Sequence, residues 1–227
     1  YNTLEPCCHY GRTPPCTREI ISAGVSAISV GIIDPNPLVN GMGVFELEKA
    51  GIETRLGECE VQISEICESY IKFISTGLPF VVAKFAMSLD GKIATKNGES
   101  KWITSDSSRI YGSRLRRESD AVMVGIGTVL SDNPRLTARD EGGNALGKQP
   151  YRIVLDSKAR MSASSDLFGE RGPIMVVTAG SLGEGRVSAL ELAGAEVVRI
   201  TSRNDQVDLD ELFKLLADRG ITRVLVE

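Results

Sequence analysis

The 227-residue sequence has no excess of positive charge and no long hydrophobic run. Its 26 Lys and Arg are outnumbered by 30 Asp and Glu, which gives a formal net charge of -4. This balance argues against a sequence-independent nucleic-acid binder, which needs a basic excess to neutralise phosphates. The longest apolar stretches, such as Phe80–Phe85, are far too short to cross a bilayer, and no charged-then-apolar leader opens the sequence. We therefore expect a cytoplasmic protein that has no nucleic-acid or membrane partner.

Histidine, tryptophan and cysteine are also scarce. The sequence has one His, one Trp and five Cys. An odd number of cysteines in a chain of ordinary apolar content is a poor match to a secreted disulfide framework, so we expect reduced thiols, some of which could bind a metal. With 42% hydrophobic and 25% charged residues, the composition is typical of a globular protein, and the length favours two domains.

A composition change at residues 75–79, Ser-Thr-Gly-Leu-Pro, divides the sequence into two parts. We expect one domain over residues 1–76 and a second over residues 77–227. In the second part strands and helices alternate, which predicts an α/β domain with a largely parallel sheet. The expected helices are 17–23, 44–50, 61–74, 106–118, 185–193 and 209–219, and the expected strands are 27–33, 80–86, 121–124, 151–155, 174–178, 196–200 and 223–226.

The segment 5–16, Glu-Pro-Cys-Cys-His-Tyr-Gly-Arg-Thr-Pro-Pro-Cys, carries the most specific signal in the sequence. Zinc deaminases hold their metal with one His or Cys plus two cysteines, and a separate Glu moves protons. Cys7 and Cys16 could be the two thiolates, although nucleobase deaminases generally place fewer residues between them. On the cysteine positions alone, buried structural cysteines are an equal alternative.

The Gly-Arg-Thr-Pro-Pro run inside this segment closely resembles the deaminase domain of the bifunctional deaminase/reductases of riboflavin biosynthesis. The resemblance implies a cytidine-deaminase-like fold over residues 1–76, of which this sequence has the C-terminal part. It also implies that Cys7 and Cys16 bind zinc and that His9 and Arg12 contact the substrate. The His-x-Glu element that supplies a third ligand and the proton-shuttling Glu in that family is missing from the sequence. We therefore expect weak zinc binding and no deamination by these residues alone.

The part that begins at Phe80 resembles the reductase domain of the same enzymes, whose fold is similar to dihydrofolate reductase. The resemblance rests on Val82–Lys92, on Gly98–Ser105 with the only Trp, and on Gly125–Pro134 after an expected strand. Taken singly, these segments could be a hairpin, a core aromatic beside a helix N-cap, and an ordinary turn. Two glycines after a strand nevertheless allow backbone N–H groups to approach a phosphate.

The resemblance implies that the second domain binds NADPH and a phosphorylated pyrimidine. We expect Lys84 and possibly Glu227 near the reacting carbon. Ser157 and Arg160 follow an expected strand, where a hydroxyl and a cation could hold the 2'-phosphate of NADPH. Without the resemblance, the simplest interpretation of the basic cluster Arg114, Arg116 and Arg117 is a solvated helix face. The positions that match cofactor contacts are Ala86, Trp102, Thr128, Asp132 and Ser157, and those that match substrate contacts are Ser100, Arg116, Leu136, Arg139 and Glu227.

The function implied by the resemblance is a two-step conversion. A diaminopyrimidine that carries a ribosyl phosphate is deaminated, and the ribosyl group of the product is reduced to ribityl by a hydride from NADPH. We also expect the sequence to be part of a longer, homo-oligomeric protein in which a glycine-rich stretch follows Glu227. One alternative is another dihydrofolate-reductase-like NADPH reductase with a decayed deaminase domain. A second is a zinc-stabilised binding module without enzymatic activity.

The segment from Ser157 to Arg160 generates a test of cofactor choice. Arg160→Ala would remove a charged hydrogen-bond donor, and such bonds are worth roughly 1.5–3 kcal/mol. We expect the dissociation constant of NADPH to rise by roughly one to two orders of magnitude, because about 1.4 kcal/mol corresponds to a factor of ten. NADH has no 2'-phosphate, so its constant should hardly change. Binding titrations with both cofactors measure the difference, and equal weakening of both would assign Arg160 to the fold or to the pyrophosphate instead.

Overall fold

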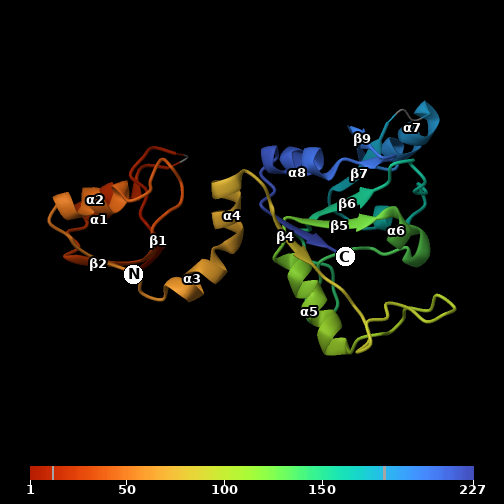
Figure 1. Cartoon of the computed structure of the whole chain (residues 1–227), viewed down its shortest axis with the longest axis horizontal. Helices are drawn as coiled ribbons and strands as arrows, with labels where there is room; N and C mark the ends of the chain where they lie inside the picture. Colours follow the sequence, from red (N-terminus) through yellow and green to blue (C-terminus); the bar gives the residue numbers. More distant parts are fainter. Residues whose placement is uncertain (12, 181–182) are drawn as a thin grey trace. The chain divides into compact units, whose positions relative to one another are not determined.

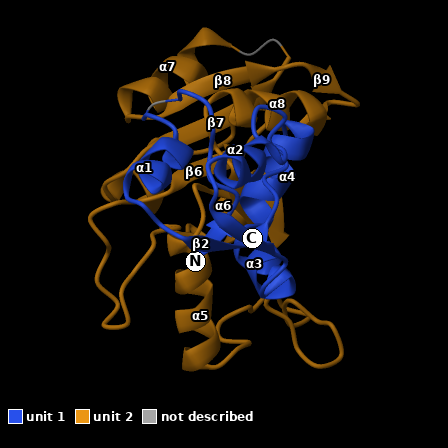
Figure 2. Ribbon diagram, turned by 90° about the vertical axis from the view of Figure 1, so that its left-hand side faces the viewer, with its two compact units in different colours: residues 1–78 blue, residues 79–227 orange. Residues whose placement is uncertain are grey.

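The structure is a computed structural model that describes residues 1–11, 13–180 and 183–227. The chain forms two compact units, residues 1–78 and 79–227, which Figure 2 shows in different colours. The division falls between Leu78 and Pro79, within the composition change at residues 75–79. Each unit has a sheet and a hydrophobic core of its own.

The first unit is built on a small parallel sheet with the strand order β1-β2-β3. Its central strand β2 (Ala27–Ile32) lies where the sequence predicts a buried strand, and it packs against Leu47. The sequence pattern does not predict the edge strands β1 (Asn2–Leu4) and β3 (Glu53–Leu56), because neither has a run of buried apolar residues. The helices of this unit are α1 (Cys16–Ser22), α2 (Met42–Lys49), α3 (Glu60–Ile66) and α4 (Glu68–Thr76). The expected helical segment 61–74 is thus divided into α3 and α4 at Cys67.

The second unit contains a larger sheet with the strand order β4-β11-β5-β6-β7-β8. Every neighbouring pair in this sheet is parallel, which confirms the α/β class predicted from the alternation of strands and helices. β4 ends at Ala83 rather than at the expected residue 86, and Ala83 is paired with Val226 of β11. The strands are β4 (Phe80–Ala83), β5 (Ala121–Gly125), β6 (Tyr151–Leu155), β7 (Ile174–Ala179), β8 (Glu196–Ile200) and β11 (Arg223–Val226).

Helices cover both faces of this sheet: α5 (Asp106–Arg117), α6 (Ile126–Asp132), α7 (Glu184–Leu192) and α8 (Leu209–Asp218). The connections from β4 to β5, from β5 to β6 and from β7 to β8 step in one direction, and the connection from β8 to β11 steps back. Right-handed crossovers therefore place α5, α6 and α7 on one face and α8 on the other. Figure 1 shows α5 and α8 on opposite sides of β5. The two hydrophobic clusters agree with this placement of the helices. Val129 and Leu190 pack with Val122 on one face of the sheet, whereas Leu216 packs with Met123 on the opposite face.

Short elements that the sequence pattern does not predict lie between β6 and α8. A 3₁₀ helix spans Asp166–Gly169, and an antiparallel hairpin is formed by β9 (Ser202–Arg203) and β10 (Gln206–Val207). Asn204 and Asp205 at the hairpin turn both have positive φ, as a two-residue type I′ turn requires. Val207 is buried in the core beside α8, so the hairpin is anchored to the second unit.

The carboxyl ends of the parallel strands meet at one edge of the sheet. Lys84 follows β4 and Glu227 follows β11, while Gly125 ends β5 and the segment that begins at Asp156 follows β6. Because β11 lies between β4 and β5, Glu227 is placed between Lys84 and Gly125 along this edge. Crevices beyond the carboxyl ends of the strands are the usual ligand sites of open α/β sheets, so this edge is the first place to look for a site.

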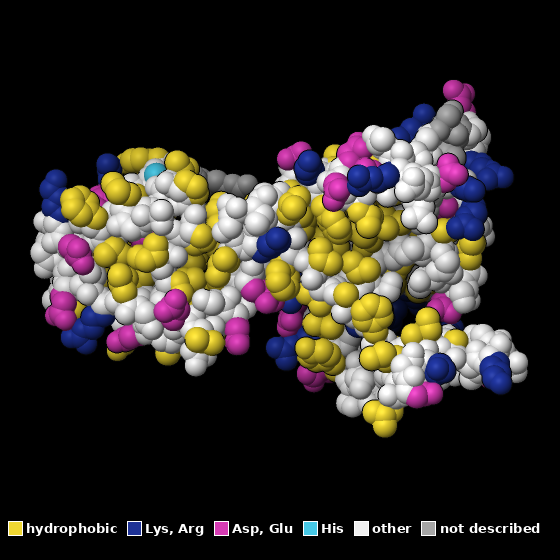
Figure 3. All heavy atoms as spheres, viewed as in Figure 1, with side chains coloured by type: hydrophobic (Ala, Val, Ile, Leu, Met, Phe, Trp, Pro, Cys, Tyr) yellow, Lys and Arg dark blue, Asp and Glu magenta, His cyan; other side chains and the backbone are white. Residues whose placement is uncertain are grey.

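Large apolar side chains also lie on the surface of both units (Figure 3). Phe45 of α2 and Ile66 of α3 are exposed in the first unit, as are Phe85 and Leu89 in the second. No helix in the described ranges is long and apolar enough to cross a membrane.

The packing of α8 against the sheet generates a stability test. Leu216 is 0% exposed and Leu192 of α7 is 89% exposed, so the two leucines form a matched pair. Leu216→Ala should destabilise the second unit by roughly 2–5 kcal/mol through lost burial and the cavity left behind, whereas Leu192→Ala should change its stability by less than about 0.5 kcal/mol. Urea denaturation followed by circular dichroism measures both. Similar small effects in the two variants would contradict the proposed packing of α8.

Candidate active site

Three charged side chains meet at the carboxyl edge of the larger sheet. Oε2 of Glu227 lies 2.9 Å from Nζ of Lys84. Arg116, in the last turn of α5, donates from Nε to Oε1 of Glu227 at 2.6 Å and from Nη2 to Oε2 at 2.8 Å. Two parallel hydrogen bonds between a guanidinium and a carboxylate form a strong and geometrically specific pair. We call these residues the ion network. From the sequence, Lys84 and possibly Glu227 are expected near one carbon and Arg116 among the substrate contacts, and the structure brings the three side chains into contact.

The ion network is largely withdrawn from solvent. The side chain of Glu227 is 9% exposed, and those of Arg116 and Lys84 are 23% and 30% exposed. Burial alone would raise the pKa of Glu227, but the hydrogen bonds and charge of Arg116, assisted by Lys84, outweigh it and lower the pKa below its ordinary value. Glu227 is therefore a carboxylate at neutral pH. Two cations face one carboxylate, so the network keeps an excess positive charge that suits an anionic ligand or a developing negative charge.

Helix α5 holds the network in place. Ser105 caps its start, because its hydroxyl oxygen accepts a hydrogen bond from the N–H of Ser108. Farther along, a Cβ added to Gly112 would lie 3.7 Å from Cε of Lys84, so the lysine side chain passes directly over this glycine. Gly112 and Arg116 are four residues apart and share a face of the helix, which places Lys84 and Glu227 side by side.

The segment after α6 is tied to the same helix. Arg116 donates from Nη1 to the carbonyl oxygen of Thr137 at 3.3 Å, and Ser113 hydrogen-bonds to both the N–H and the carbonyl of Arg139. The guanidinium of Arg139 is already engaged with the carbonyl of Gly143 and lies 3.5 Å from Glu170. Leu136, in the same segment, is 3% exposed and packs in the core of the second unit.

A pocket of about 570 Å³ opens at the carboxyl ends of β5 and β6. Ser157 and Arg160 line it, as does the turn between Gly125 and Gly127. Arg160 is 52% exposed, and its Nε lies 3.8 Å from Oδ1 of the buried Asp156, which holds the guanidinium near the rim. Thr128 and Asp132 are partly buried one turn apart on α6. Polar side chains from the β9–β10 hairpin complete the wall, namely Asn204, Asp205 and Gln206.

The sequence analysis missed this hairpin wall. The Asn-Asp pair at 204–205 is a recognisable signal for a two-residue turn, but nothing local shows that the turn faces a pocket formed by β5 and β6. The long connection between β4 and α5 carries the remaining expected contacts. Ala86 and Ser100 are partly buried there, and Trp102 is 72% exposed, which rules out the alternative of a core aromatic.

In the first unit the structure places two of the expected zinc ligands together. The backbone N–H of Cys16 donates to Sγ of Cys7 at 3.4 Å, and a hydrogen bond with the Cys7 side chain, followed by burial, raises the pKa of Cys16. His9 lies in the same loop, and its Nδ1 is buried without a hydrogen-bond partner. Arg12 is outside the described residues. Within the described ranges no group of three or more His, Cys, Asp or Glu side chains could hold a metal ion, so Cys7 and Cys16 do not by themselves form a complete zinc site.

Glu5, two residues before Cys7, stabilises the backbone beside this cysteine loop through buried hydrogen bonds. Its carboxylate is 3% exposed and accepts backbone N–H groups from Asp34 at 3.2 Å, Gly41 at 2.8 Å and Val44 at 3.0 Å. The last two donors belong to the start of α2, so Glu5 acts as a distant helix cap. A Cβ at Gly43 would lie 2.0 Å from the carbonyl oxygen of Pro6, so α2 can approach the loop only with glycine there.

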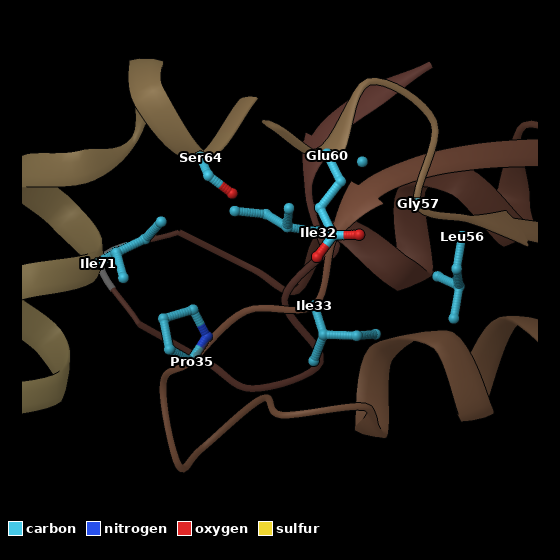
Figure 4. Close-up of a pocket in the computed structure, with 9 residues that line it drawn as sticks. Ile32, Ile33, Pro35, Leu56, Gly57, Glu60, Ser64 and Ile71 are labelled. Atoms are coloured by element: carbon cyan, nitrogen blue, oxygen red, sulfur yellow. The ribbon is translucent and has the colours of Figure 1, made fainter. Parts of the chain in front are cut away.

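A second cavity, of about 410 Å³, lies within the first unit between its sheet and helices α3 and α4 (Figure 4). Its walls are mainly apolar, with Ile32, Ile33 and Ile71 among them. Glu60 and Ser64 of α3 are the polar side chains among its lining residues. These two side chains form no charge network like that at the carboxyl edge of the larger sheet, so the cavity is the weaker candidate for an active site.

Known proteins resemble the chain along its whole length. The family described as RibD C-terminal domain matches residues 79–227. Riboflavin biosynthesis protein RibD of Bacillus amyloliquefaciens is 40% identical over 228 residues, which cover 100% of this chain and 60% of that protein. The solved structure of a diaminohydroxyphosphoribosylaminopyrimidine deaminase/5-amino-6-(5-phosphoribosylamino)uracil reductase from Thermotoga maritima is 37% identical with a TM-score of 0.81, covering 99% of this chain and 60% of that one. A structure of Acinetobacter baumannii RibD gives a TM-score of 0.81 at 35% identity with the same coverage. The chain thus spans about 60% of the length of these relatives.

The lowered pKa of Glu227 generates a test of the ion network. A carboxyl whose folded pKa is depressed stabilises the fold fully above its unfolded pKa, about 4.3 for Glu, and loses that contribution as the pH falls through the folded value. Arg116→Ala should raise the pKa of Glu227, because burial then opposes ionisation with only Lys84 to offset it. Carbon NMR of the Glu227 carboxyl during a pH titration measures the shift. Arg114→Ala, which breaks an exposed pair with Glu118, is the matched control and should leave the pKa of Glu227 unchanged.

Proposed function

Because the chain belongs to the RibD C-terminal domain family through residues 79–227, we propose that its second unit is an NADPH-dependent reductase of riboflavin biosynthesis. The proposed substrate is a pyrimidine that carries a phosphoribosylamino group, and the proposed product carries a ribityl chain. The observation that carries the proposal is the buried ion network of Lys84, Glu227 and Arg116 at the carboxyl edge of the sheet. The pocket at Ser157 and Arg160, on the neighbouring strands of the same edge, supports it.

The pocket fits a phosphorylated dinucleotide. Its lining contains the Ser157 hydroxyl and the cations of Lys158 and Arg160, which are suitable partners for a 2'-phosphate. The turn at Gly125 and Gly127 offers backbone close enough for a pyrophosphate to approach without meeting side chains, since a Cβ at either position would contact nothing within 4 Å. When bound, NADPH would supply the hydride that reduces the substrate.

The ion network then assigns roles to its residues. Reduction of a ring-opened ribosylamine adds a hydride to C1 of the sugar, which breaks the C=N π bond, and one proton must reach the nitrogen. Glu227 is ionised and hydrogen-bonded on both oxygens, so it is poorly suited to donate that proton. Lys84 carries exchangeable protons and is oriented by Glu227, so we assign proton donation to its ammonium group. Arg116 is a positioning residue that fixes the carboxylate in turn.

The remaining expected contacts are retained as parts of this proposal. Ala86, Trp102, Thr128 and Asp132 would contact the cofactor, and Ser100, Leu136 and Arg139 would contact the substrate. Of these residues, Arg139 lies in the segment that Ser113 and Arg116 tie to α5.

For the first unit we propose descent from a zinc deaminase domain without assigning it deamination. The proximity of Cys7 and Cys16 supports this origin, as does the similarity of the whole chain to a protein named as both deaminase and reductase. A third ligand and a carboxylate placed for proton transfer would also be needed, and no group of three or more ligating side chains that could hold a metal occurs among the described residues. The same observation gives no support to a zinc-stabilised binding module.

Loss of the proposed proton donor tests the function. Lys84→Met keeps the length of the side chain but removes its charge and protons, so the rate of NADPH oxidation with the phosphoribosylamino pyrimidine should fall by roughly 10²–10⁴. Lys214→Met, on the exposed side of α8, is the matched control and should retain the wild-type rate. Stopped-flow absorbance of NADPH measures both. A wild-type protein that fails to oxidise NADPH with this substrate would overturn the proposed function, and full activity of Lys84→Met would overturn the assigned role.

A further inference from the structure

An exposed indole is held against a cation next to the ion network. Trp102, the only Trp in the sequence, is 72% exposed, and the guanidinium carbon of Arg109 lies 4.3 Å from the centre of its ring. Arg109 also donates from Nη1 to the carbonyl oxygen of Thr104 at 2.9 Å and pairs with Asp106. The arginine is therefore fixed to both the loop and the start of α5. One face of the indole is covered by the cation, while most of the ring surface remains open.

The cation against the indole shares a face of α5 with residues of the ion network. Arg109, Gly112 and Arg116 are separated by three and four residues, the spacing of neighbours along one side of a helix. Lys84 passes over Gly112, and Arg116 binds Glu227. At 1.5 Å per residue, Arg109 lies roughly 10 Å from Arg116 along the helix axis. Gly112, over which Lys84 passes, lies between them and one turn from Arg109, so a ligand that reacts beside Lys84 lies near the turn that carries the cation of the indole.

The contacts of Trp102 do not suit a purely structural role. An aromatic side chain that stabilises a loop usually does so by burying its ring, whereas this ring is mostly exposed. The neighbouring cation has several partners in the loop and in α5, and it would hold the segment without the indole. An open aromatic face beside a reactive site is instead suited to stacking against a planar ring.

We propose that Arg109 is a positioning residue that orients Trp102 so that the open face of the indole packs against the nicotinamide ring of NADPH. This inference rests on the proposed function, because it requires that NADPH bind with its reactive ring near Lys84. Arg109 itself does not touch the cofactor. It fixes the indole plane before the cofactor arrives, which lowers the cost of ordering that side chain on binding.

The test uses Trp102 as its own reporter. In Arg109→Ala without cofactor, Trp102 fluorescence should be quenched more strongly by acrylamide, because the covered face becomes accessible. The dissociation constant of NADPH, followed by the fluorescence of the cofactor, should rise roughly two- to fivefold, the size expected of an exposed cation–π contact. Arg109→Gln keeps a donor for the Thr104 carbonyl but removes the charge, and it should give the same two changes. Arg114→Ala, on the same helix and paired with Glu118, is the matched control and should change neither.

A double-mutant cycle separates positioning from a general effect on the loop. In a Trp102→Leu background, Arg109→Gln should have no further effect on NADPH binding. An unchanged NADPH constant in Arg109→Gln, or an equal rise with and without the indole, would overturn the inference while leaving the proposed function intact. A wild-type protein that binds no NADPH would instead overturn the proposed function, and the inference with it.

Discussion

The paired hydrogen bonds between Arg116 and Glu227 are the contact on which the rest of the site depends. They join residues 111 positions apart in the sequence, and Lys84 is held by the same carboxylate from 143 positions away. A carboxylate that is only 9% exposed is costly to keep ionised without partners. Loss of either cation would leave a buried charge with less compensation. The network therefore ties β4, β11 and α5 into one arrangement, and the positions of the three side chains are specified together.

Helix α5 carries contacts to the site along its whole length. Its last turn carries Arg116, its middle carries the glycine over which Lys84 passes, and its first turns carry Arg109 beneath the indole of Trp102. Arg114 lies on the exposed side and pairs with Glu118, as a solvated helix face would. The basic cluster of this helix thus divides by helical period into residues that build the site and residues that face water.

The strand order places the two halves of the site beside each other. β11 enters the sheet between β4 and β5, so Glu227 is followed along the edge by the turn at Gly125 and then by the segment that contains Ser157. A group that binds at Arg160 and extends along this edge is directed toward Lys84. The arrangement needs the final crossover through α8, which returns the chain from β8 at one end of the sheet to a place next to β4.

The sequence by itself determined the α/β class, the strands of the larger sheet and most helices, because these depend on local periodicity and on the Gly and Pro residues that interrupt it. It also marked Lys84, Arg116 and Glu227 through their resemblance to a known family. Edge strands such as β1 and β3 and the hairpin beside Arg160 have weak local patterns, since their form is set by the partners they meet. Only the tertiary structure decided that Arg116 binds Glu227 and that Arg109 covers Trp102. Such contacts depend on which strand lies next to which, and that order is fixed by burying helices on both faces of the sheet rather than by any signal near the residues themselves.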